Sequence, residues 1–341
     1  MRAQGSLPRY ILQRVLLVIP MVLVLLTLVF LLLRVAPGDP ISATLGDKVS
    51  EAYKEKQQEK LGLNDPIWVQ YGRYLWGILH GDFGTTITDH RAVTDVIITH
   101  GGATLELSVT AFIIAAILGL VLGTVAGRLR DTFPDVVIRL FGIFTYATPV
   151  FFLGLLFLLL FVAKLHWFSP GQQASPETQF LVPTRTHILL LDAIIAANGP
   201  AILDVLAHLA LPAITLGLLL AGVFIRLVRV NVLQTLQGDY IEAARARGVS
   251  EGHVLRRHAL RNALVPVVTV MGLQAALLLS GAVLTESTFD WPGIGNELVD
   301  YLTKRDYGAV QGIITVFAVA VVLISMLIDI INALIDPRVR Y

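Results

Sequence analysis

Six apolar stretches, each about as long as a bilayer's hydrocarbon core is thick, constrain this chain more than any other feature. A helix needs roughly 20 apolar residues to cross a membrane, and none of the six contains Asp, Glu, Lys or Arg. Hydrophobic residues make up 55% of the chain and charged residues only 15%, far from the average of soluble proteins. We therefore expect an all-α integral membrane protein with the spans Val15–Leu33, Leu107–Gly127, Leu140–Ala163, Val205–Ile225, Asn262–Thr285 and Tyr307–Ile328.

Basic residues near the ends of these stretches indicate how the chain is oriented. In membrane proteins, Lys and Arg concentrate in the short cytoplasmic loops. The loops that we assign to the cytoplasm are rich in Arg, whereas the opposite loops mix basic with acidic residues. One orientation then satisfies all six spans and puts both termini in the cytoplasm; the residues that support it are Arg2, Arg9, Arg14, Arg128, Arg130, Arg139, Arg226, Arg229, Arg338 and Arg340.

The first stretch is interpreted as a membrane helix rather than a cleaved signal peptide. The apolar region of a signal peptide is shorter and ends at a small-residue cleavage site, and Val35-Ala36-Pro37 is a poor one. Pro20 lies inside the stretch, which membrane helices tolerate where neighbours satisfy the freed carbonyl.

The polar segments divide the chain into parts. Residues 1–33 form the cytoplasmic N-terminus and first span, 34–103 an extracytoplasmic loop region, 104–336 a five-helix core containing the loop 231–263, and 337–341 a cytoplasmic tail. Charges at helical spacing predict a surface helix over Ser50–Leu61. Residues 164–204 are too interrupted to span and predict an outward loop with a short helix. The Pro292-Gly293 turn indicates a re-entrant loop or interfacial helix before the last span.

Two further patterns concern packing. Gly119, Gly123 and Gly127 recur every four residues, which predicts a small-residue face for close contact with another helix. In the loop region, four aromatic residues fit either an interfacial belt or simple packing of that layer, and we favour packing; they are Trp68, Tyr71, Tyr74 and Trp76.

A polar and basic segment, Gly238–Pro266, separates the fourth and fifth spans. Asp239 is placed to cap a helix N-terminus, with Glu242 three residues later and helix-forming alanines beyond it. Gly248 supplies a stop, because glycine accepts the left-handed geometry in which many helices end. Ser250 is then placed to cap a second helix. The pattern predicts a short helix, a sharp turn and another helix on the cytoplasmic side.

This segment resembles a known motif. Glu242-Ala243-Ala244 followed by Gly248 is similar to the EAA loop of importer-type ABC permeases, and ARARG…RRHALRNALVP resembles the version in the dipeptide, oligopeptide and nickel permease family. The general importer pattern has an earlier Leu-Pro pair, whereas this chain has Leu264-Val265-Pro266, which favours the peptide/nickel branch over sugar or phosphate importers. The segments APGDP, LGLNDPIWVQYGRYL, GDFGTTI and WPGIG also resemble this family, and its dipeptide members most.

The resemblance implies a bacterial inner-membrane permease subunit for dipeptides or short oligopeptides. Its implied partners are a second homologous permease, cytoplasmic ATP-binding subunits or a fused ATPase, and an extracytoplasmic substrate-binding protein. It further implies that the short helix is a coupling helix that docks on the ATPase, with Arg245 and Arg247 facing an acidic rim. The implied coupling residues are Asp239, Tyr240, Glu242, Ala243, Ala244, Arg245, Arg247, Gly248 and Val249.

Polar residues within the spans are candidates for a translocation path. Tyr146 and Thr148 stand beside Pro149, where a kink can face a cavity, although helix packing explains such groups nearly as well. Gln274 is a third candidate by polarity. A proton relay is a weaker hypothesis, because the available carboxylates lie at predicted span ends where water reaches them; they are Glu106, Glu286 and Asp329.

Several kinds of chemistry are missing from the sequence. There is no GK[ST] loop for ATP phosphates, no HExxH and no GxSxG, and the absence of cysteine removes thiolate metal sites and disulfides. His253 and His258 are five residues apart, so we expect them not to share a helix face. A net charge of +1 gives no reason to expect nucleic acid. We expect no catalytic residues, metal or cofactor, and an energy source on another chain.

Other functions fit the same pattern less well. A nickel or glutathione permease of the same family would present similar motifs. An ion-coupled secondary transporter or channel would need a site near the bilayer midplane and possibly inverted repeats, and no convincing repeat is visible. An intramembrane enzyme would need a catalytic dyad or metal set that the sequence does not show, and a scaffolding subunit would be told apart by its co-purifying partners.

Overall fold

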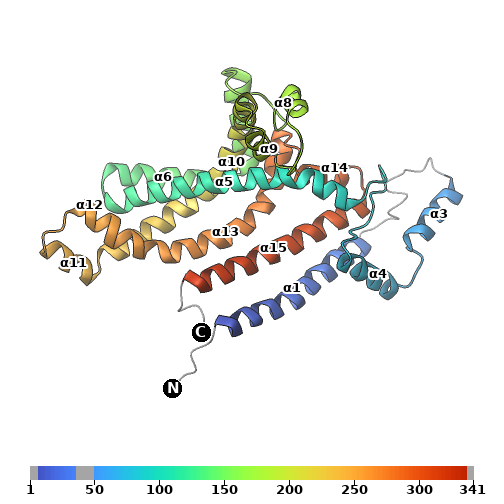
Figure 1. Ribbon diagram of the computed structural model, residues 1–341, viewed down its shortest axis with the longest axis horizontal. Helices are drawn as coiled ribbons and strands as arrows, with labels where there is room; N and C mark the ends of the chain where they lie inside the picture. The colour runs from blue at the N-terminus through green and yellow to red at the C-terminus, as the bar shows by residue number, and fades with distance from the viewer. Residues whose placement is uncertain (1–6, 36–49, 336–341) are drawn as a thin grey trace.

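The computed structural model describes residues 7–35 and 50–335, which fold almost entirely into helices (Figure 1). Within those ranges the β structure is one antiparallel bridge between Thr85 and Ala92. The predicted all-α class is confirmed. The helices are α1 (Leu7–Val35), α3 (Glu51–Leu61), α4 (Ile67–Leu79), α5 (Val93–Arg128), α6 (Phe133–Ala147), α7 (Val150–Phe157), η1 (Leu158–Lys164), α8 (Pro176–Leu181), α9 (Leu189–Ile195), α10 (Gly199–Leu236), α11 (Asp239–Ala246), α12 (Glu251–His253), η2 (Val254–Ala259), α13 (Leu260–Phe289), α14 (Ile294–Thr303) and α15 (Tyr307–Ile335).

A few sequence predictions lie outside the described residues. They concern Arg2, the APGDP segment at 36–40, and the tail 337–341 with Arg338 and Arg340. The surface helix predicted over Ser50–Leu61 is confirmed as α3, whose N-cap position is Ser50.

Four helices are long and apolar enough to cross a membrane, judged by length and composition within the described ranges. They are α1, α5, α10 and α15, and α6 with α7 and η1 adds a fifth if that bent pair counts as one span. Pro20 is accommodated inside α1, as expected. The fifth predicted span lies within α13, a continuous helix that includes Pro266.

Helices α5 and α10 extend well beyond the apolar runs that predicted them. α5 begins at Val93 and α10 at Gly199. The start of α10 is fixed by Asn198, whose side chain accepts a hydrogen bond from the backbone N–H of Ala201, 3.2 Å away. Hydropathy therefore marks the section that can lie in lipid, whereas caps and tertiary contacts decide where each helix ends.

The glycine face of α5 packs against α10, as predicted. A Cβ added at Gly123 would lie 2.6 Å from the Cβ of Val228, closer than carbon atoms can pack. Each of the three glycines faces a larger side chain of α10, so the backbones of the two helices approach closely. The facing pairs are Gly119 with Phe224, Gly123 with Val228, and Gly127 with Val232.

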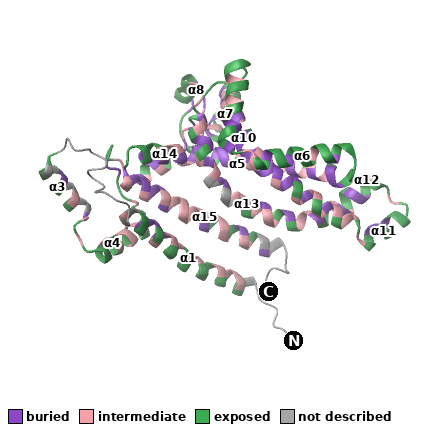
Figure 2. Cartoon of the chain, turned by 180° about the vertical axis from the view of Figure 1, so that it is seen from behind, coloured by how far each residue is buried: buried purple, intermediate pink, exposed green. Residues whose placement is uncertain are grey.

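The main hydrophobic core follows this contact between α5 and α10. Figure 2 shows buried positions concentrated along α5, α10 and α13, while α1 and α6 expose much of their surface. The same cluster of buried residues continues from Phe224 and Val232 on α10 to Ile241 on α11 and Ala259 on η2. The short helices of the polar segment are therefore packed as part of the core rather than attached loosely to it.

The third predicted span, Leu140–Ala163, is sharply bent in the structure. Its sequence forms α6 and then α7 with η1, and the two parts meet at 104° around Thr148 and Pro149. Pro149 has no backbone N–H, and the residue before a proline is disfavoured in the helical region. Thr148 accordingly takes an extended conformation, with ψ 126°. The sequence indicated a kink here but not a break of this size.

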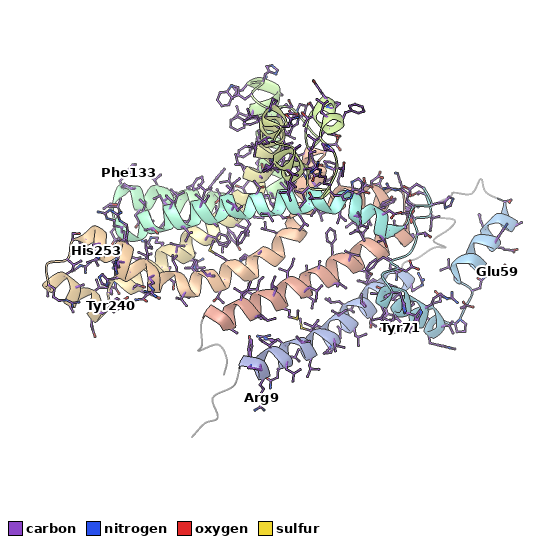
Figure 3. The ribbon with its side chains drawn as sticks, viewed as in Figure 1. Arg9, Glu59, Tyr71, Phe133, Tyr240 and His253 are labelled. Carbon is purple, nitrogen blue, oxygen red and sulfur yellow. The ribbon has the colours of Figure 1, made fainter. Side chains whose placement is uncertain are left out.

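The predicted loop region contains a helix that packs onto the end of α1. Tyr71 and Tyr74 of α4 lie against the ring of Phe30, at centroid distances of 5.2 and 5.5 Å. Tyr74 also shares a hydrogen bond of 2.7 Å with Thr315 of α15. Packing thus explains these two tyrosines, one of which is labelled in Figure 3. Trp68 and Trp76, by contrast, are mostly exposed, so packing within the chain does not account for them.

The segments that connect the long helices gather at one region of α5. α8, α9 and α14 lie together near α5 and α7 in Figure 1, which agrees with the predicted short helices in these segments. Trp291 is fully buried there, and its indole N–H donates to the carbonyl of Ala103 over 2.9 Å. This hydrogen bond joins the start of α14 to α5.

Candidate functional site

The helices α11, α12 and η2 form a compact projection between α10 and α13. We name it the coupling element, after the role that the sequence resemblance implies for it. It lies at the far end of the molecule from α3 and α4 (Figure 1). α11 starts at Asp239, and its N-cap residue is Gly238, without a side-chain cap. The prediction that Asp239 caps this helix is therefore wrong. Asp239 and Glu242 instead lie in the first turn, where their negative charges interact favourably with the helix dipole.

Gly248 follows the end of α11, as predicted. Its φ of +80° lies in the left-handed region, which residues with a Cβ disfavour. The N–H of Gly248 donates to the carbonyl of Arg245 at 2.8 Å, and the N–H of Val249 donates to that of Ala244 at 3.2 Å. These two bonds define a Schellman motif, which satisfies carbonyls that a helix end otherwise leaves unpaired.

The predicted coupling residues divide between two faces of α11. Ala244 is fully buried together with Ile241 and packs into the main core. Ala243 and the charged residues around it are exposed, and Tyr240 is 44% exposed. Ala244 therefore anchors the element from within, while the exposed residues form a surface; these are Asp239, Tyr240, Glu242, Ala243, Arg245, Arg247 and Gly248.

An ion pair braces the turn after α11. The guanidinium of Arg245 donates to the carboxylate of Glu251 on α12, with an Nε–Oε1 distance of 2.7 Å. This hydrogen bond raises the pKa of Arg245 and lowers the pKa of Glu251. Arg247 donates from Nε to the carbonyl of Ala243, 3.2 Å away. Ser250 occupies the N-cap position of α12, as predicted, although its side chain makes no cap hydrogen bond.

His253 and His258 lie side by side, contrary to the prediction that they do not share a helix face. Their ring centroids are 5.9 Å apart. Residues 254–259 form a π-helical turn, in which hydrogen bonds join residues five apart, so side chains at this spacing come together. Across the described ranges there is no group of three His, Cys, Asp or Glu residues that could hold a metal ion.

A second feature is a cavity of about 540 Å³ lined by α6, α10 and one residue of α13. Two of the predicted path residues, Tyr146 and Gln274, line it together although they are far apart in sequence. Thr148 is not among the lining residues; its hydroxyl donates to the carbonyl of Phe144 over 2.7 Å. The cavity also contains arginines that the sequence reasoning assigned only to orientation: Arg139, Arg226 and Arg229.

Asp135 fixes one wall of this cavity. Its side chain is fully buried, and both of its oxygens accept hydrogen bonds from Arg229, at 2.7 and 2.8 Å. The backbone N–H of Asp131 donates to the same carboxylate at 3.0 Å, and Arg139 lies 3.6 Å away. The sequence offered one signal for this pair, an acidic residue just before one apolar stretch and basic residues just after another.

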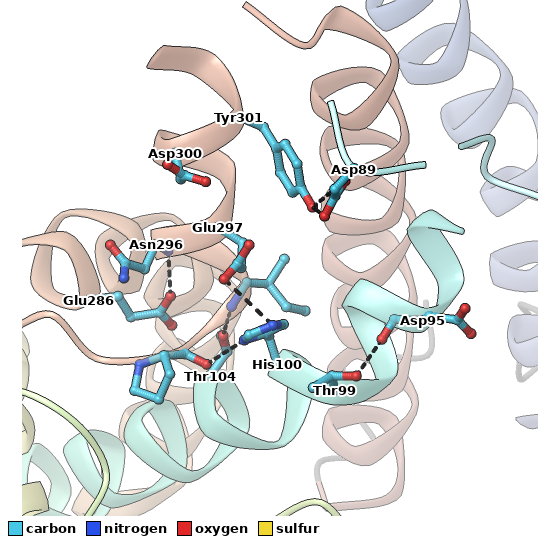
Figure 4. A network of polar contacts seen from close by, with 12 residues as sticks. Asp89, Asp95, Thr99, His100, Thr104, Glu286, Asn296, Glu297, Asp300 and Tyr301 are labelled. Carbon is cyan, nitrogen blue, oxygen red and sulfur yellow. Dashed lines mark hydrogen bonds and ion pairs between the residues drawn. The ribbon is translucent and has the colours of Figure 1, made fainter. Parts of the chain in front are cut away.

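Two carboxylates that we expected water to reach are buried. Glu106 is 5% exposed and accepts hydrogen bonds from the N–H of Leu190 at 2.9 Å and from Gln173 at 2.7 Å. Glu286 is completely buried and accepts from the N–H of Asn296 at 3.0 Å (Figure 4). The expectation is wrong because the connecting segments fold over the helix ends and exclude solvent. Asp329 does remain 25% exposed, and it pairs with Arg14 at 3.1 Å.

The Glu286 carboxylate explains a glycine in the WPGIG motif. A Cβ at Gly293 would lie 2.3 Å from the carboxyl carbon of Glu286, so only glycine leaves room for it. Figure 4 shows Asn296 on the adjoining helix and Thr104 of α5 at the same junction. The hydroxyl oxygen of Thr104 accepts from the N–H of Ile294 at 2.9 Å. The motif therefore joins α5, α13 and α14.

Fold and site together define a helical membrane protein with a compact projection of short helices between the long helices α10 and α13. The chain belongs to the family described as binding-protein-dependent transport system inner membrane component: the model of that family matches residues 119–341, and the model of its N-terminal region matches residues 7–107. It is therefore an integral inner-membrane protein, a permease subunit of an ABC importer that acts with ATPase and substrate-binding partners and is not itself an enzyme.

Curated relatives match nearly the whole chain. The chain is 36% identical over 337 residues to the dipeptide transport system permease protein DppB of Escherichia coli K12, covering 98% of this chain and 99% of the relative. It is 36% identical over 333 residues to the di/tripeptide transport system permease protein DppB of Pseudomonas aeruginosa, covering 97% and 98%. It is also 35% identical over 332 residues to the glutathione transport system permease protein GsiC of Salmonella paratyphi A, covering 97% and 99%.

Proposed function

We propose that this chain is the permease subunit of an ATP-driven importer that translocates dipeptides or short oligopeptides. The family and the names of the relatives support the substrate class, because dipeptide and di/tripeptide permeases match over almost the full length. A glutathione permease matches at a similar level, so glutathione, itself a short peptide, is the second candidate. The observation that carries the proposal is the exposed, internally braced α11, which offers a rigid surface to a partner.

In this proposal the chain crosses the bacterial inner membrane six times. The crossings are α1, α5, the α6–α7 pair, α10, α13 and α15. The Arg-rich loops put the coupling element and both termini in the cytoplasm. The segments with α3, α4, α8, α9 and α14 then lie on the outer side, where a substrate-binding protein docks.

The coupling element acts as a lever between partner and path. ATPase subunits, separate or fused, dock on the exposed face of α11, and a second homologous permease completes the path. Because Ile241 and Ala244 are packed into the core shared with α10, displacement of α11 moves that helix as well. Tyr146 and Gln274 line the path in its α6–α10 section. Rocking between two states requires each ligand to prefer one state by a few kcal/mol.

Reconstitution tests the substrate and the coupling role together. The complete importer in proteoliposomes, supplied with its binding protein and ATP, is expected to accumulate labelled dipeptides. Gly248→Asp adds a Cβ and a charge at a left-handed position, so we expect intact assembly and ATP hydrolysis that no longer drives uptake. Gly252→Asp is the matched control, because the same change four residues later meets no positive φ. Normal uptake by the Gly248 variant would refute the coupling role, and wild-type transport of non-peptide solutes alone would refute the substrate.

Orientation has its own test. The native chain lacks cysteine, so single cysteines report cleanly. Glu59→Cys on α3 is expected to react with an impermeant thiol reagent on intact spheroplasts, and Glu251→Cys only after lysis. The reverse labelling pattern would overturn the proposed orientation.

A further inference from the structure

The cavity between α6 and α10 carries more positive charge than its surroundings neutralise. Three arginines line it, Arg139 from α6 and Arg226 and Arg229 from α10. One carboxylate, that of Asp135, faces them; it accepts hydrogen bonds from Nε and Nη2 of Arg229, and Nε of Arg139 lies 3.6 Å from it. Arg229 and Arg139 therefore share one buried carboxylate, and the lining carries more positive than negative charge.

Arg226 is the one of these arginines that no partner holds. Within the described ranges it makes no ion pair or hydrogen bond, and its side chain is exposed to the cavity. It lies three residues before Arg229, so the two side chains project from the same face of α10. Asp135 holds Arg229 against the wall, which leaves the Arg226 guanidinium available to a ligand.

The remainder of the lining suits a small molecule with both polar and apolar parts. Tyr146 presents its phenol and Gln274 its amide, while Ile143 and Val223 supply apolar surface. A volume of about 540 Å³ is within the usual range for sites that bind small molecules. An unpaired guanidinium can bind a carboxylate through two parallel hydrogen bonds, and the carboxylate is the anionic group that a short peptide carries at its C-terminus.

We propose that Arg226 binds the carboxylate of the peptide as it passes through this cavity, so that the permease itself selects peptides with a free C-terminal carboxylate. This inference rests on the proposed function and goes beyond it, because it assigns recognition to the path in addition to the binding protein. Asp135 is a positioning residue in this scheme, since it removes Arg229 from competition for the ligand.

Another role for Arg226 is pairing with an acidic residue of the second permease. Intramembrane charges commonly pair with one another, and the cavity is open on one side in this single chain. The two roles differ in what they predict. Carboxylate binding makes affinity depend on the ligand's charge, whereas a subunit contact makes assembly depend on Arg226 and leaves ligand preference unchanged.

The experiment measures binding to the complete nucleotide-free importer in detergent, without the binding protein. The probes are radiolabelled dialanine and its C-terminal amide, which differ only in the carboxylate, and equilibrium dialysis gives each Kd. We expect wild type to bind dialanine about 10-fold or more tightly than the amide, the size of one charge-assisted hydrogen bond. Arg226→Gln should weaken dialanine binding to the level of the amide and leave amide binding unchanged.

Two further variants make the result specific. Arg226→Lys keeps the charge but not the paired hydrogen bonds, so we expect part of the preference to remain. Arg130→Gln removes an exposed arginine outside the cavity and should retain the full preference. Val230→Cys, on the cavity wall, should be protected from thiol reagents by dialanine more than by the amide.

The inference is overturned if Arg226→Gln keeps the preference, loses affinity for both ligands equally, or reduces only the yield of assembled importer. It is also overturned if the wild-type importer takes up peptides but shows no preference. Failure of the proposed function looks different, because then the wild-type importer with its binding protein and ATP takes up no peptide at all.

Discussion

Gly123→Ala tests whether the close contact of α5 and α10 carries the stability of this protein. The new Cβ would lie 2.6 Å from the Cβ of Val228 and 2.8 Å from the carbonyl oxygen of Ile225. Carbon atoms pack at about 3.5–4.0 Å, so the helices must separate by about 1 Å or distort. The Ile225 oxygen belongs to the helix backbone and cannot rotate away. One methyl group is thus expected to disturb the main hydrophobic core along α5 and α10.

A matched substitution isolates this cost from helix propensity. Gly72 lies inside α4, and a Cβ added there meets nothing within 4 Å. Both Gly→Ala changes gain about 1 kcal/mol of propensity in a helix interior, which cancels between them. Overpacking typically costs about 1–3 kcal/mol. We therefore expect Gly123→Ala to be less stable than Gly72→Ala by about 1–3 kcal/mol.

Intrinsic fluorescence of the purified protein in detergent measures this difference. Trp291 is fully buried at the junction with α5, so its emission should report loss of the packed state. The apparent melting temperatures of the two variants are compared at one heating rate, because membrane proteins often unfold irreversibly. If Gly123→Ala melts at or above Gly72→Ala, the contact is not close-packed and the argument fails.

Two further outcomes are expected. Trp291→Phe replaces the indole with a smaller ring and removes the N–H that donates to the carbonyl of Ala103, which keeps its α-helical hydrogen bond. Loss of this one hydrogen bond should cost about 0.5–1.5 kcal/mol, the vacated volume should add to that cost, and the apparent melting temperature should fall; an unchanged value would contradict the prediction. Burial, together with the charge of Asp89, raises the pKa of Tyr301. The stability that this shift contributes is fully present below about pH 10, the pKa of a tyrosine in the unfolded chain. It is lost as pH rises from there towards the folded pKa. The melting temperature should therefore fall more steeply above pH 10 than in Tyr301→Phe; parallel curves would contradict the shift.

The coupling element was predictable to the extent that its signals are local. Gly248 indicates a left-handed position, and the alanines before it indicate a helix. The helix, its end and the turn therefore lie where the sequence predicted them. Two details depended on geometry that no local rule fixes. The N-cap is Gly238 instead of Asp239, and a π-helical turn brings His253 and His258 together.

Hydropathy predicted which segments can cross a membrane. It did not predict the shape of those helices or which segments cover their ends. The break at Pro149 turns one predicted span into two helices at 104°. Glu106 is covered by a connecting segment whose Leu190 donates to it from 84 residues away, and Glu286 is covered by the start of α14, whose Asn296 donates to it from ten residues away. The grouping of Tyr146 and Gln274 at one cavity, with Arg226 beside them, likewise depends on how α6, α10 and α13 pack.

The sequence alone determined that this is an all-helical membrane protein with a small-residue helix contact and a projection of short helices between two long ones, because apolar length, glycine spacing and helix-ending residues act over a few turns of chain. Only the tertiary structure decided which charges are neutralised. Asp135 and Arg229 are 94 residues apart in the chain, and their pairing requires α6 and α10 to be packed side by side. Electrostatic and packing forces act through space, so an arginine left free by that packing cannot be recognised from the order of residues.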